Sequence, residues 1–402
     1  MKLKIARFLD EAVLYAVYGV VFFIPISISA VGIFAGIAIL SFLVKQALSV
    51  DLNGIKDNKA LFLLLLLFFA FMGLSLFNSG PLFAKSLKAL LIKWGRFPLL
   101  LWVMIDTLRD TRRIIGAVHV LVFSAALVGL TVFTQKFFGF EFLRGRVLES
   151  FSTPSTGPFK NQNSLAAYSA CVAPVVLAVS MWKKEKIVTK LALFMVTGLL
   201  ILSLAWATSR GGWLGLITGL FFIILVTNSS RIKKVFWPVL LSSYLFFMPL
   251  VVLALLFYKG RLNSNSERLT IISGAWRMIK EHPLIGKGLG TFMDYCAAYT
   301  NNIGVYYAHN CYLQMWAESG IFSLISFLLI AGYVFYGSIN AILKMPAKIE
   351  FYILTGLTAG LLGYLAHAFF DVHLYSFELS FLFWVVLGLT VALTQRMRTP
   401  AA

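Results

Sequence analysis

One histidine and two arginines are the residues of this 402-residue chain best suited to chemistry. His309 follows two aromatic residues, and an imidazole that titrates near neutral pH is the usual general base for a hydroxyl group. Arg210 lies in a short glycine-rich turn, and Arg268 begins a polar helical stretch. Guanidinium groups match phosphate oxygens and stay charged at any accessible pH, so two of them can hold a pyrophosphate. The three residue types predict general-base chemistry beside a phosphorylated group.

Each of these residues also has an interpretation without chemistry. An interfacial histidine is often structural, an arginine beside an apolar run can extend towards lipid headgroups, and Arg268 alone is an ordinary surface residue of a helix. A charge retained next to hydrocarbon is costly, which favours a function for Arg210. The other histidines, in turns or apolar runs, have weaker cases. Because no two histidines have zinc-protease spacing, we predict no catalytic metal and no cofactor. These other histidines are His119, His282, His367 and His373.

A second group of polar residues is predicted to bind substrate. Lys93 and Arg96 lie one helical turn apart in an apolar run, where they contact a lipid phosphate or extend to headgroups; both interpretations stay open. The segment 157–163 precedes another apolar run, so its amides either bind a glycan or cap the helix that follows. The predicted substrate-binding residues are Lys93, Arg96, Asn161, Asn163, Arg277, Asn310, Tyr312 and Gln314.

The composition requires a membrane around these residues. Hydrophobic residues make up 60% of the chain and charged residues 13%, whereas soluble domains are roughly 45–50% apolar and about 25% charged. Repeated apolar runs of about 20 residues have the length that crosses a bilayer. We therefore predict an all-α, polytopic integral membrane protein in which 1–402 form one membrane domain.

About twelve transmembrane helices are predicted. The first two are short and flank Pro25, and the fourth is interrupted by Lys93 and Arg96. The predicted spans are 12–28, 30–45, 60–78, 87–106, 114–134, 164–182, 187–207, 212–228, 237–257, 318–341, 350–370 and 376–395.

The basic residues set the orientation. The net charge of +19 is carried largely by short clusters between apolar runs, which is typical of cytoplasmic loops and argues against a nucleic-acid partner. We expect both termini in the cytoplasm and the first span, without a cleavage site, to act as a signal anchor. The long connections 135–163 and 258–317 then face outward, where a polar site can be assembled.

The larger outward loop, 258–317, is expected to contain an amphipathic helix over 267–281 that lies on the membrane surface. Cys296 and Cys311 share this loop and either pair or stay as free thiols. Glu318 lies about half a helical revolution from His309 on a continuous helix, so we interpret it as structural.

Several separated segments together resemble the O-antigen ligase and polymerase superfamily of bacterial membrane glycosyltransferases. Their order, spacing and topology match over nearly the whole chain. The segments are 157–163, 209–213, 266–268, 275–276, 283–292, 309–314 and 318–320.

The resemblance implies an inverting, metal-independent transfer of a glycan from undecaprenyl pyrophosphate to an acceptor hydroxyl, such as one on a lipid A core sugar. The protein would lie in the bacterial inner membrane, among its lipids, with the active site and both long loops on the periplasmic side. His309 corresponds to the essential histidine of the family and Arg210 and Arg268 to its two essential arginines. The loop 258–317 would be the catalytic loop and close over the pyrophosphate.

Three alternatives remain. A polymerase of repeat units and a protein O-oligosaccharyltransferase share this chemistry and differ in the acceptor. A transporter or flippase of a lipid-linked glycan would lack covalent catalysis. Transporters place ionisable residues near the membrane midplane and show internal repeats, neither of which we find here. The sequence therefore favours the ligase.

Overall fold

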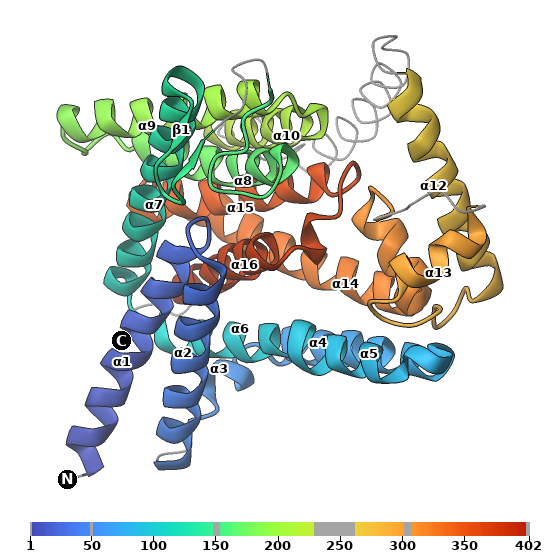
Figure 1. Ribbon diagram of the computed structural model, residues 1–402. Coiled ribbons are helices and arrows are strands. Elements are labelled where there is room, and N and C mark those ends of the chain that lie inside the picture. The colour runs from blue at the N-terminus through green and yellow to red at the C-terminus, as the bar shows by residue number, and fades with distance from the viewer. Residues whose placement is uncertain (1, 49–50, 148–152, 229–261, 301–306, 399–402) are drawn as a thin grey trace.

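The computed structural model describes residues 2–48, 51–147, 153–228, 262–300 and 307–398 (Figure 1). Within these ranges the chain is helical apart from turns and one short antiparallel pair of strands, in which Phe140 pairs with Val147 and Glu141 with Arg146. The expectation of an all-α protein is confirmed.

The helices follow the apolar runs. The first part of the chain forms α1 (Lys2–Phe23), α2 (Ile28–Leu48), α3 (Asn53–Lys56), α4 (Lys59–Leu74), η1 (Ser75–Asn78), η2 (Gly80–Leu82), α5 (Phe83–Lys88), η3 (Ala89–Trp94), α6 (Arg96–Thr107) and α7 (Thr111–Phe138). The rest forms β1 (Phe140–Glu141), β2 (Arg146–Val147), α8 (Gln162–Ser180), α9 (Ile187–Ala207), α10 (Arg210–Thr227), α12 (Leu262–Glu281), α13 (Phe292–Tyr299), α14 (Cys311–Lys344), α15 (Ile349–His367), η5 (His373–Tyr375) and α16 (Phe377–Arg398).

Nine of the helices in the described ranges are long and apolar enough to cross a membrane. They are α2, α4 with η1, α7, α8, α9, α10, α14, α15 and α16. Such a set identifies a multi-pass membrane protein, while the number twelve stays a prediction. The predicted span 237–257 lies outside the described residues.

The predicted span 87–106 is not one α-helix. The π-helical turn η3 occupies its first part, and the Gly95 amide donates to the carbonyl of Leu90 at 2.8 Å, five residues back. The regular helix α6 begins only at Arg96. A π-helical turn widens the backbone and is frequent at functional sites, and this one carries Lys93.

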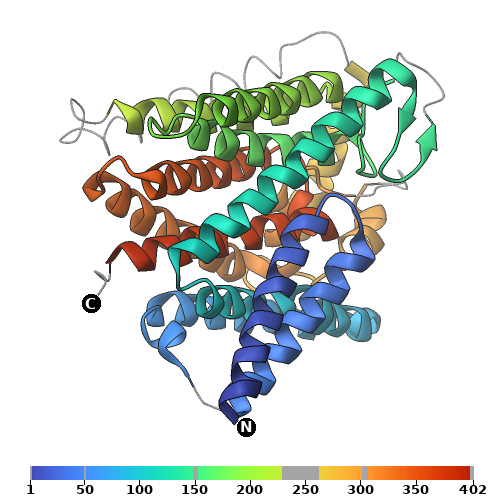
Figure 2. The same cartoon turned by 90° about the vertical axis from the view of Figure 1, so that its left-hand side faces the viewer.

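The helices form stacked layers. In Figures 1 and 2, α8, α9 and α10 lie over α15, followed by α14 and α16, with α4 to α6 beyond them. Helix α16 lies at the centre, since 94% of its most apolar stretch of 18 residues is buried. Backbones approach closely where α15 meets α8 and α10, because Gly360 and Gly363 leave no room for a side chain there, as is common between membrane helices.

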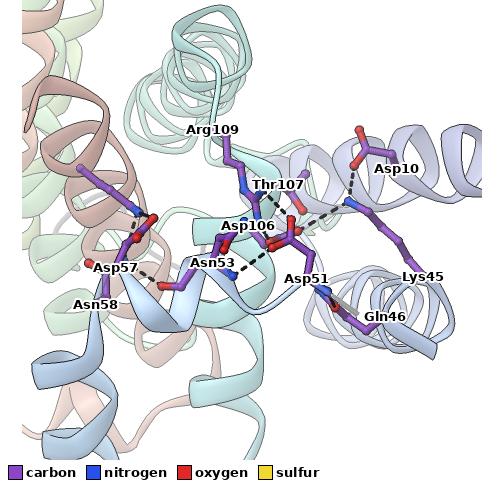
Figure 3. A network of polar contacts seen from close by, with 12 residues as sticks. Asp10, Lys45, Gln46, Asp51, Asn53, Asp57, Asn58, Asp106, Thr107 and Arg109 are labelled. Carbon is purple, nitrogen blue, oxygen red and sulfur yellow. Dashed lines mark hydrogen bonds and ion pairs between the residues drawn. The ribbon is translucent and has the colours of Figure 1, made fainter. Parts of the chain in front are cut away.

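One end of the bundle carries a network of ion pairs (Figure 3). Lys45 of α2 contacts Asp10 of α1 at 2.6 Å and Asp106 of α6 at 3.5 Å. Arg109 bonds Asp106 and also contacts Asp51 at 2.8 Å. The network ties three helices together at the end that the basic clusters predict to be cytoplasmic.

The connections at the other end are held by hydrogen bonds between segments that are distant in sequence. They run from Arg144 Nε to the Ile26 carbonyl at 3.3 Å, from the Ser155 amide to the Trp206 carbonyl at 3.0 Å, from the Leu289 amide to Ser75 Oγ at 3.2 Å, and from the Cys311 amide to the Ala368 carbonyl at 2.8 Å. These bonds attach both predicted outward loops to the same end of the bundle.

Replacing Asp106 by Asn should destabilise the protein by about 1–3 kcal/mol, because the buried side chain would lose two charged partners. The measurement is thermal unfolding of the purified protein in detergent. Glu185→Gln is the control, since Glu185 lies in a turn at the same end and forms no ion pair with a described residue. Equal melting temperatures for the two variants would contradict the role of Asp106.

Candidate active site

His309 lies where the start of α14 meets the end of α15. Its φ of 50° is in the left-handed region, an unfavourable conformation for a residue other than glycine. The next residues hold it there. The Asn310 side chain accepts from the Leu313 amide and so caps α14, and Cys311 binds the end of α15 through its amide and, at 3.1 Å, donates from Sγ to the Asp371 carbonyl. The strained backbone thus occurs at the predicted general base.

The surroundings of His309 favour a neutral imidazole. Partial burial and the positive charge of Arg268 lower the pKa of His309, while the carboxylate of Asp371 raises it by less. Its Nδ1 atom is buried and has no hydrogen-bond partner among the described residues. A neutral imidazole is the form that accepts a proton, so the electrostatics suit a general base.

Arg210 occupies the first position of α10. Helix α9 ends at Ala207, and the next residue, Thr208, has a φ of 52° that turns the chain back within two residues. The adjacent Gly211 packs against α15 so tightly that a Cβ there would lie 2.8 Å from the Cβ of Phe370 and also clash with His367. The glycine after Arg210 therefore lets this turn lie directly against the end of α15.

Arg268 connects these two neighbourhoods. It is half-buried on α12, one turn before the buried Ile271. Its charge acts on His309 and also on His367, the residue that Gly211 contacts. The structure thus brings the surroundings of Arg210, Arg268 and His309 together at the outer end of α15.

Three residues of this neighbourhood were not selected by sequence reasoning: His367, Asp371 and His373. The rings of His367 and His373 lie 4.8 Å apart, and Nε2 of His373 lies 3.0 Å from the Tyr364 carbonyl. Burial lowers the pKa of His373 to about 4, which keeps it neutral. The sequence feature that could have identified these residues is an aspartate between two histidines after an apolar run. The proximity of this aspartate to His309, however, depends on tertiary structure.

Glu318 fixes the large loop to α14, in agreement with its predicted structural role. Its buried carboxylate accepts from the amide of Gly290 at 2.8 Å and from that of Phe292 at 3.2 Å. Two residues later in this helix, Gly320 interrupts the regular backbone with a φ of 81° and lies against the backbone of Leu284 in the loop. The loop between α12 and α13 is therefore held by backbone contacts.

Lys93 and Arg96 face aromatic rings of the bundle. The Nζ atom of Lys93 lies 5.3 Å from the Tyr375 ring centroid and within electrostatic range of Glu318. The Arg96 guanidinium lies 4.8 Å from the centre of the Phe377 ring. Both side chains thus approach η5 and the start of α16, beside the His309 neighbourhood, and their predicted contact with substrate stays a prediction.

The segment 157–163 is held by residues on both sides. Gln135 of α7 accepts from the Thr156 and Gly157 amides at 3.1 and 2.8 Å. Arg146 donates to the carbonyls of Gly157 and Phe159. Asn161 caps α8 by accepting from the Ser164 amide at 2.9 Å, and Asn163 is half-buried in the first turn. Capping, one of the two open interpretations, is therefore present.

Tyr312 and Gln314 support the position of His309. The Tyr312 hydroxyl donates to the Leu365 carbonyl at 2.7 Å, which adds a second contact between α14 and α15. The Gln314 side-chain oxygen accepts from the amide of Ala308, the residue before His309, at 3.2 Å, and its nitrogen donates to Glu318. Both were predicted to bind substrate, and in the structure both position the backbone around the histidine.

Arg277 lies apart from this neighbourhood. It lies nine residues after Arg268, which places it half a turn away around the helix at 3.6 residues per turn, and it is exposed whereas Arg268 is half-buried. Its guanidinium donates to the Tyr299 carbonyl at 3.3 Å. Cys296 and Cys311 are both buried, free thiols. In the described part of the chain, no group of three or more acidic, cysteine or histidine side chains is arranged to hold a metal ion.

Comparison with known proteins places a family domain over this site. Residues 193–328 match the family model described as O-antigen ligase. The match includes Arg210, Arg268 and His309 and supports the superfamily that the motifs resemble. A search of curated proteins found no match to the chain.

The electrostatics of the site can be tested on His309 itself. Removing the positive charge with Arg268→Gln should raise the pKa of His309, and removing the carboxylate with Asp371→Asn should lower it. The measurement is an NMR titration of labelled histidine, with the His309 signal assigned by its loss in His309→Gln. Arg277→Gln is the matched control and should leave the pKa in place. Shifts in the opposite directions would show that these charges do not act on His309.

Proposed function

Since residues 193–328 match the O-antigen ligase family model, we propose that this chain transfers a glycan from undecaprenyl pyrophosphate to an acceptor hydroxyl. The acceptor is a sugar of the lipid A core, and the reaction takes place at the periplasmic face of the bacterial inner membrane. The observation that carries the proposal is that Arg268 acts electrostatically on His309 and on His367, which contacts the residue after Arg210.

In the proposed reaction His309 acts as the general base. It takes the proton of the acceptor hydroxyl as the oxygen attacks the anomeric carbon from the face opposite the pyrophosphate. The bond between that carbon and the phosphate oxygen breaks, so the configuration inverts and undecaprenyl pyrophosphate leaves with the bonding electrons. The lowered pKa of His309 supports this role, because it favours the neutral imidazole that can accept a proton.

The arginines stabilise the leaving group. Negative charge develops on the bridging oxygen as the bond breaks, and fixed positive charges aimed at that position lower the barrier. Arg210 and Arg268 supply these charges, with Lys93 and Arg96 contacting the lipid phosphates from the other side of η5. Because guanidinium groups carry the charge, the reaction proceeds without a divalent metal.

The orientation follows from the two ends of the bundle. The basic clusters and the ion-pair network lie at one end, and both termini belong there, in the cytoplasm. The site residues lie at the other end, with the two long loops. This arrangement supports a site that faces the periplasm, where a lipid-linked glycan and its acceptor meet at the membrane surface.

The alternatives differ in the product. A polymerase would extend the glycan by a repeat unit, and a protein O-oligosaccharyltransferase would attach it to a serine or threonine. A transporter would form no new covalent bond. Mass spectrometry of the products formed from one donor with all three acceptors present separates these cases, and glycan on the lipid A core is the expected outcome.

His309→Ala should lower the transfer rate by about 10²–10⁴-fold, the range for a general base. Arg210→Ala and Arg268→Ala should each lower it by about 10²–10³-fold, the range for a group that stabilises developing charge. The measurement is transfer by reconstituted protein. His119→Ala and Arg112→Ala are the matched controls, because both side chains are exposed elsewhere. Wild-type rates in any of the three site variants would remove that residue from the site.

Transfer should continue at an unchanged rate in excess EDTA, because the proposed charge stabilisation comes from side chains. The assay compares initial rates before and after chelation and after magnesium is added back. An activity that disappears in EDTA and returns with magnesium would show that a metal takes part.

A further inference from the structure

A polar cavity lies in the large loop, and His309 is not among its lining residues. It has a volume of about 660 Å³ and is open to solvent. Three elements form it: the last turns of α12, the loop that follows, and α13. Its volume is within the range of about 300–1,000 Å³ that small-molecule sites occupy.

The lining combines three cations with two aromatic rings. Arg277 and Lys280 come from α12 and Lys287 from the loop, and none of them forms an ion pair with a described residue. Tyr295 and Tyr299 of α13 line the opposite side, and Nζ of Lys287 lies 5.0 Å from the centre of the Tyr295 ring. The cavity therefore attracts an anion and offers flat apolar surfaces beside it.

The loop that carries Lys287 is held in place. The amide of Lys287 donates to the Ala317 carbonyl and that of Gly288 to the Glu318 carbonyl, both at 2.9 Å. Asn78 donates to the Gly286 carbonyl at 2.8 Å. The ammonium group of Lys287 is also close to His282, with 3.3 Å between Nζ and Nε2, and burial and this charge lower the pKa of His282. The cation thus has a fixed position before any ligand binds.

One acidic residue of the lining indicates that the cavity prefers a sugar to a simple phosphate ion. Glu281 lines the same cavity and accepts a hydrogen bond from the Tyr299 hydroxyl. A carboxylate repels an isolated phosphate group but accepts hydrogen bonds from sugar hydroxyls. Cations, a carboxylate and tyrosine rings in one cavity match a ligand that has an acidic group and several hydroxyls.

We propose that this cavity is a binding site for a saccharide that carries a carboxylate or phosphate group. The inference rests on the proposed function and extends it, because it assigns an acidic sugar to the donor glycan or to the acceptor. The cavity lies on the side of α12 opposite Arg268, and Arg277 is about 14 Å further along the helix axis at 1.5 Å per residue. The bound sugar is therefore distant from the reacting bond.

The test measures binding of two trisaccharides to the full chain in nanodiscs of phosphatidylcholine. Trigalacturonate carries a carboxylate on each sugar, and maltotriose is its neutral counterpart. The wild-type protein should bind trigalacturonate at least about tenfold more tightly, and Arg277→Gln and Lys287→Gln should each remove most of this difference. The control is Lys88→Gln, an exposed lysine of the neighbouring α5 outside the cavity. Equal affinities for the two sugars would overturn the proposal.

If a variant fails to fold, the salt dependence of binding to the wild-type protein still tests the proposal. Raising the salt concentration from about 50 to about 500 mM should weaken trigalacturonate binding several-fold and leave maltotriose binding unchanged. An affinity for trigalacturonate that does not change with salt would overturn the proposal. Loss of trigalacturonate binding in nanodiscs that contain phosphatidylglycerol would also overturn it, because a lipid phosphate would then occupy the cavity.

Different results would refute the proposed function and the proposed saccharide site. Trisaccharide binding needs no lipid-linked donor and should persist in His309→Ala, so its absence in a protein that transfers glycans would refute the cavity alone. Binding without any transfer activity would refute the proposed function alone. In an active preparation, competition by trigalacturonate against the acceptor assigns the site to the acceptor, and competition against the donor assigns it to the donor glycan.

Discussion

The buried carboxylate of Glu318 is the constraint on which the outward half of the structure depends. A charge inside the bundle is tolerated only when it is well satisfied, and Glu318 finds its partners in the backbone amides of the large loop. The short helical segment between Cys311 and Gly320 thus carries the loop anchor at one end and His309 at the other. The position of α12, and with it Arg268, is set relative to His309 through this segment.

A neutral histidine among cations is the electrostatic consequence of this arrangement. Arg268 approaches His309 closely enough to lower its pKa, while Asp371 limits that effect from the other side. The same positive charge that keeps the imidazole able to accept a proton also attracts a phosphorylated substrate. In the proposed reaction, the leaving pyrophosphate supplies the negative charge that compensates the protonated histidine. One arginine would therefore serve both the base and the leaving group.

Residue chemistry alone selected His309, Arg210 and Arg268 as candidates, because few polar side chains occur beside apolar runs, and the structure brings their surroundings together. The π-helical break before Gly95 was not predictable, since the apolar run continues through it. The proximity of Asp371 and His309 depends on two helix ends that meet only in the folded chain.

Helix α12 shows what the spacing of apolar residues predicts correctly and what it does not. The helix over 267–281 was predicted and is part of α12. Its apolar residues were expected on one membrane-facing side, whereas Ala275 and Ile279 are buried in the protein and Leu269 and Trp276 are exposed. Helical geometry alone places Arg277 half a turn from Arg268. The sequence was therefore sufficient to predict that the two arginines lie on opposite sides of α12.

The two ends of the bundle use positive charge in different ways. At the end with the basic clusters, Lys45, Arg109 and Arg113 are engaged by aspartates from other elements, which joins the helices. At the outward end, Arg268, Arg277 and Lys287 form no ion pair with a described side chain. Lys85, Arg144 and Arg146 at the same end do form ion pairs. Unneutralised cations repel one another and stabilise the fold little, but they bind anions without first breaking an ion pair. Arg268, Arg277 and Lys287 are therefore better explained by anionic substrates than by the stability of the fold.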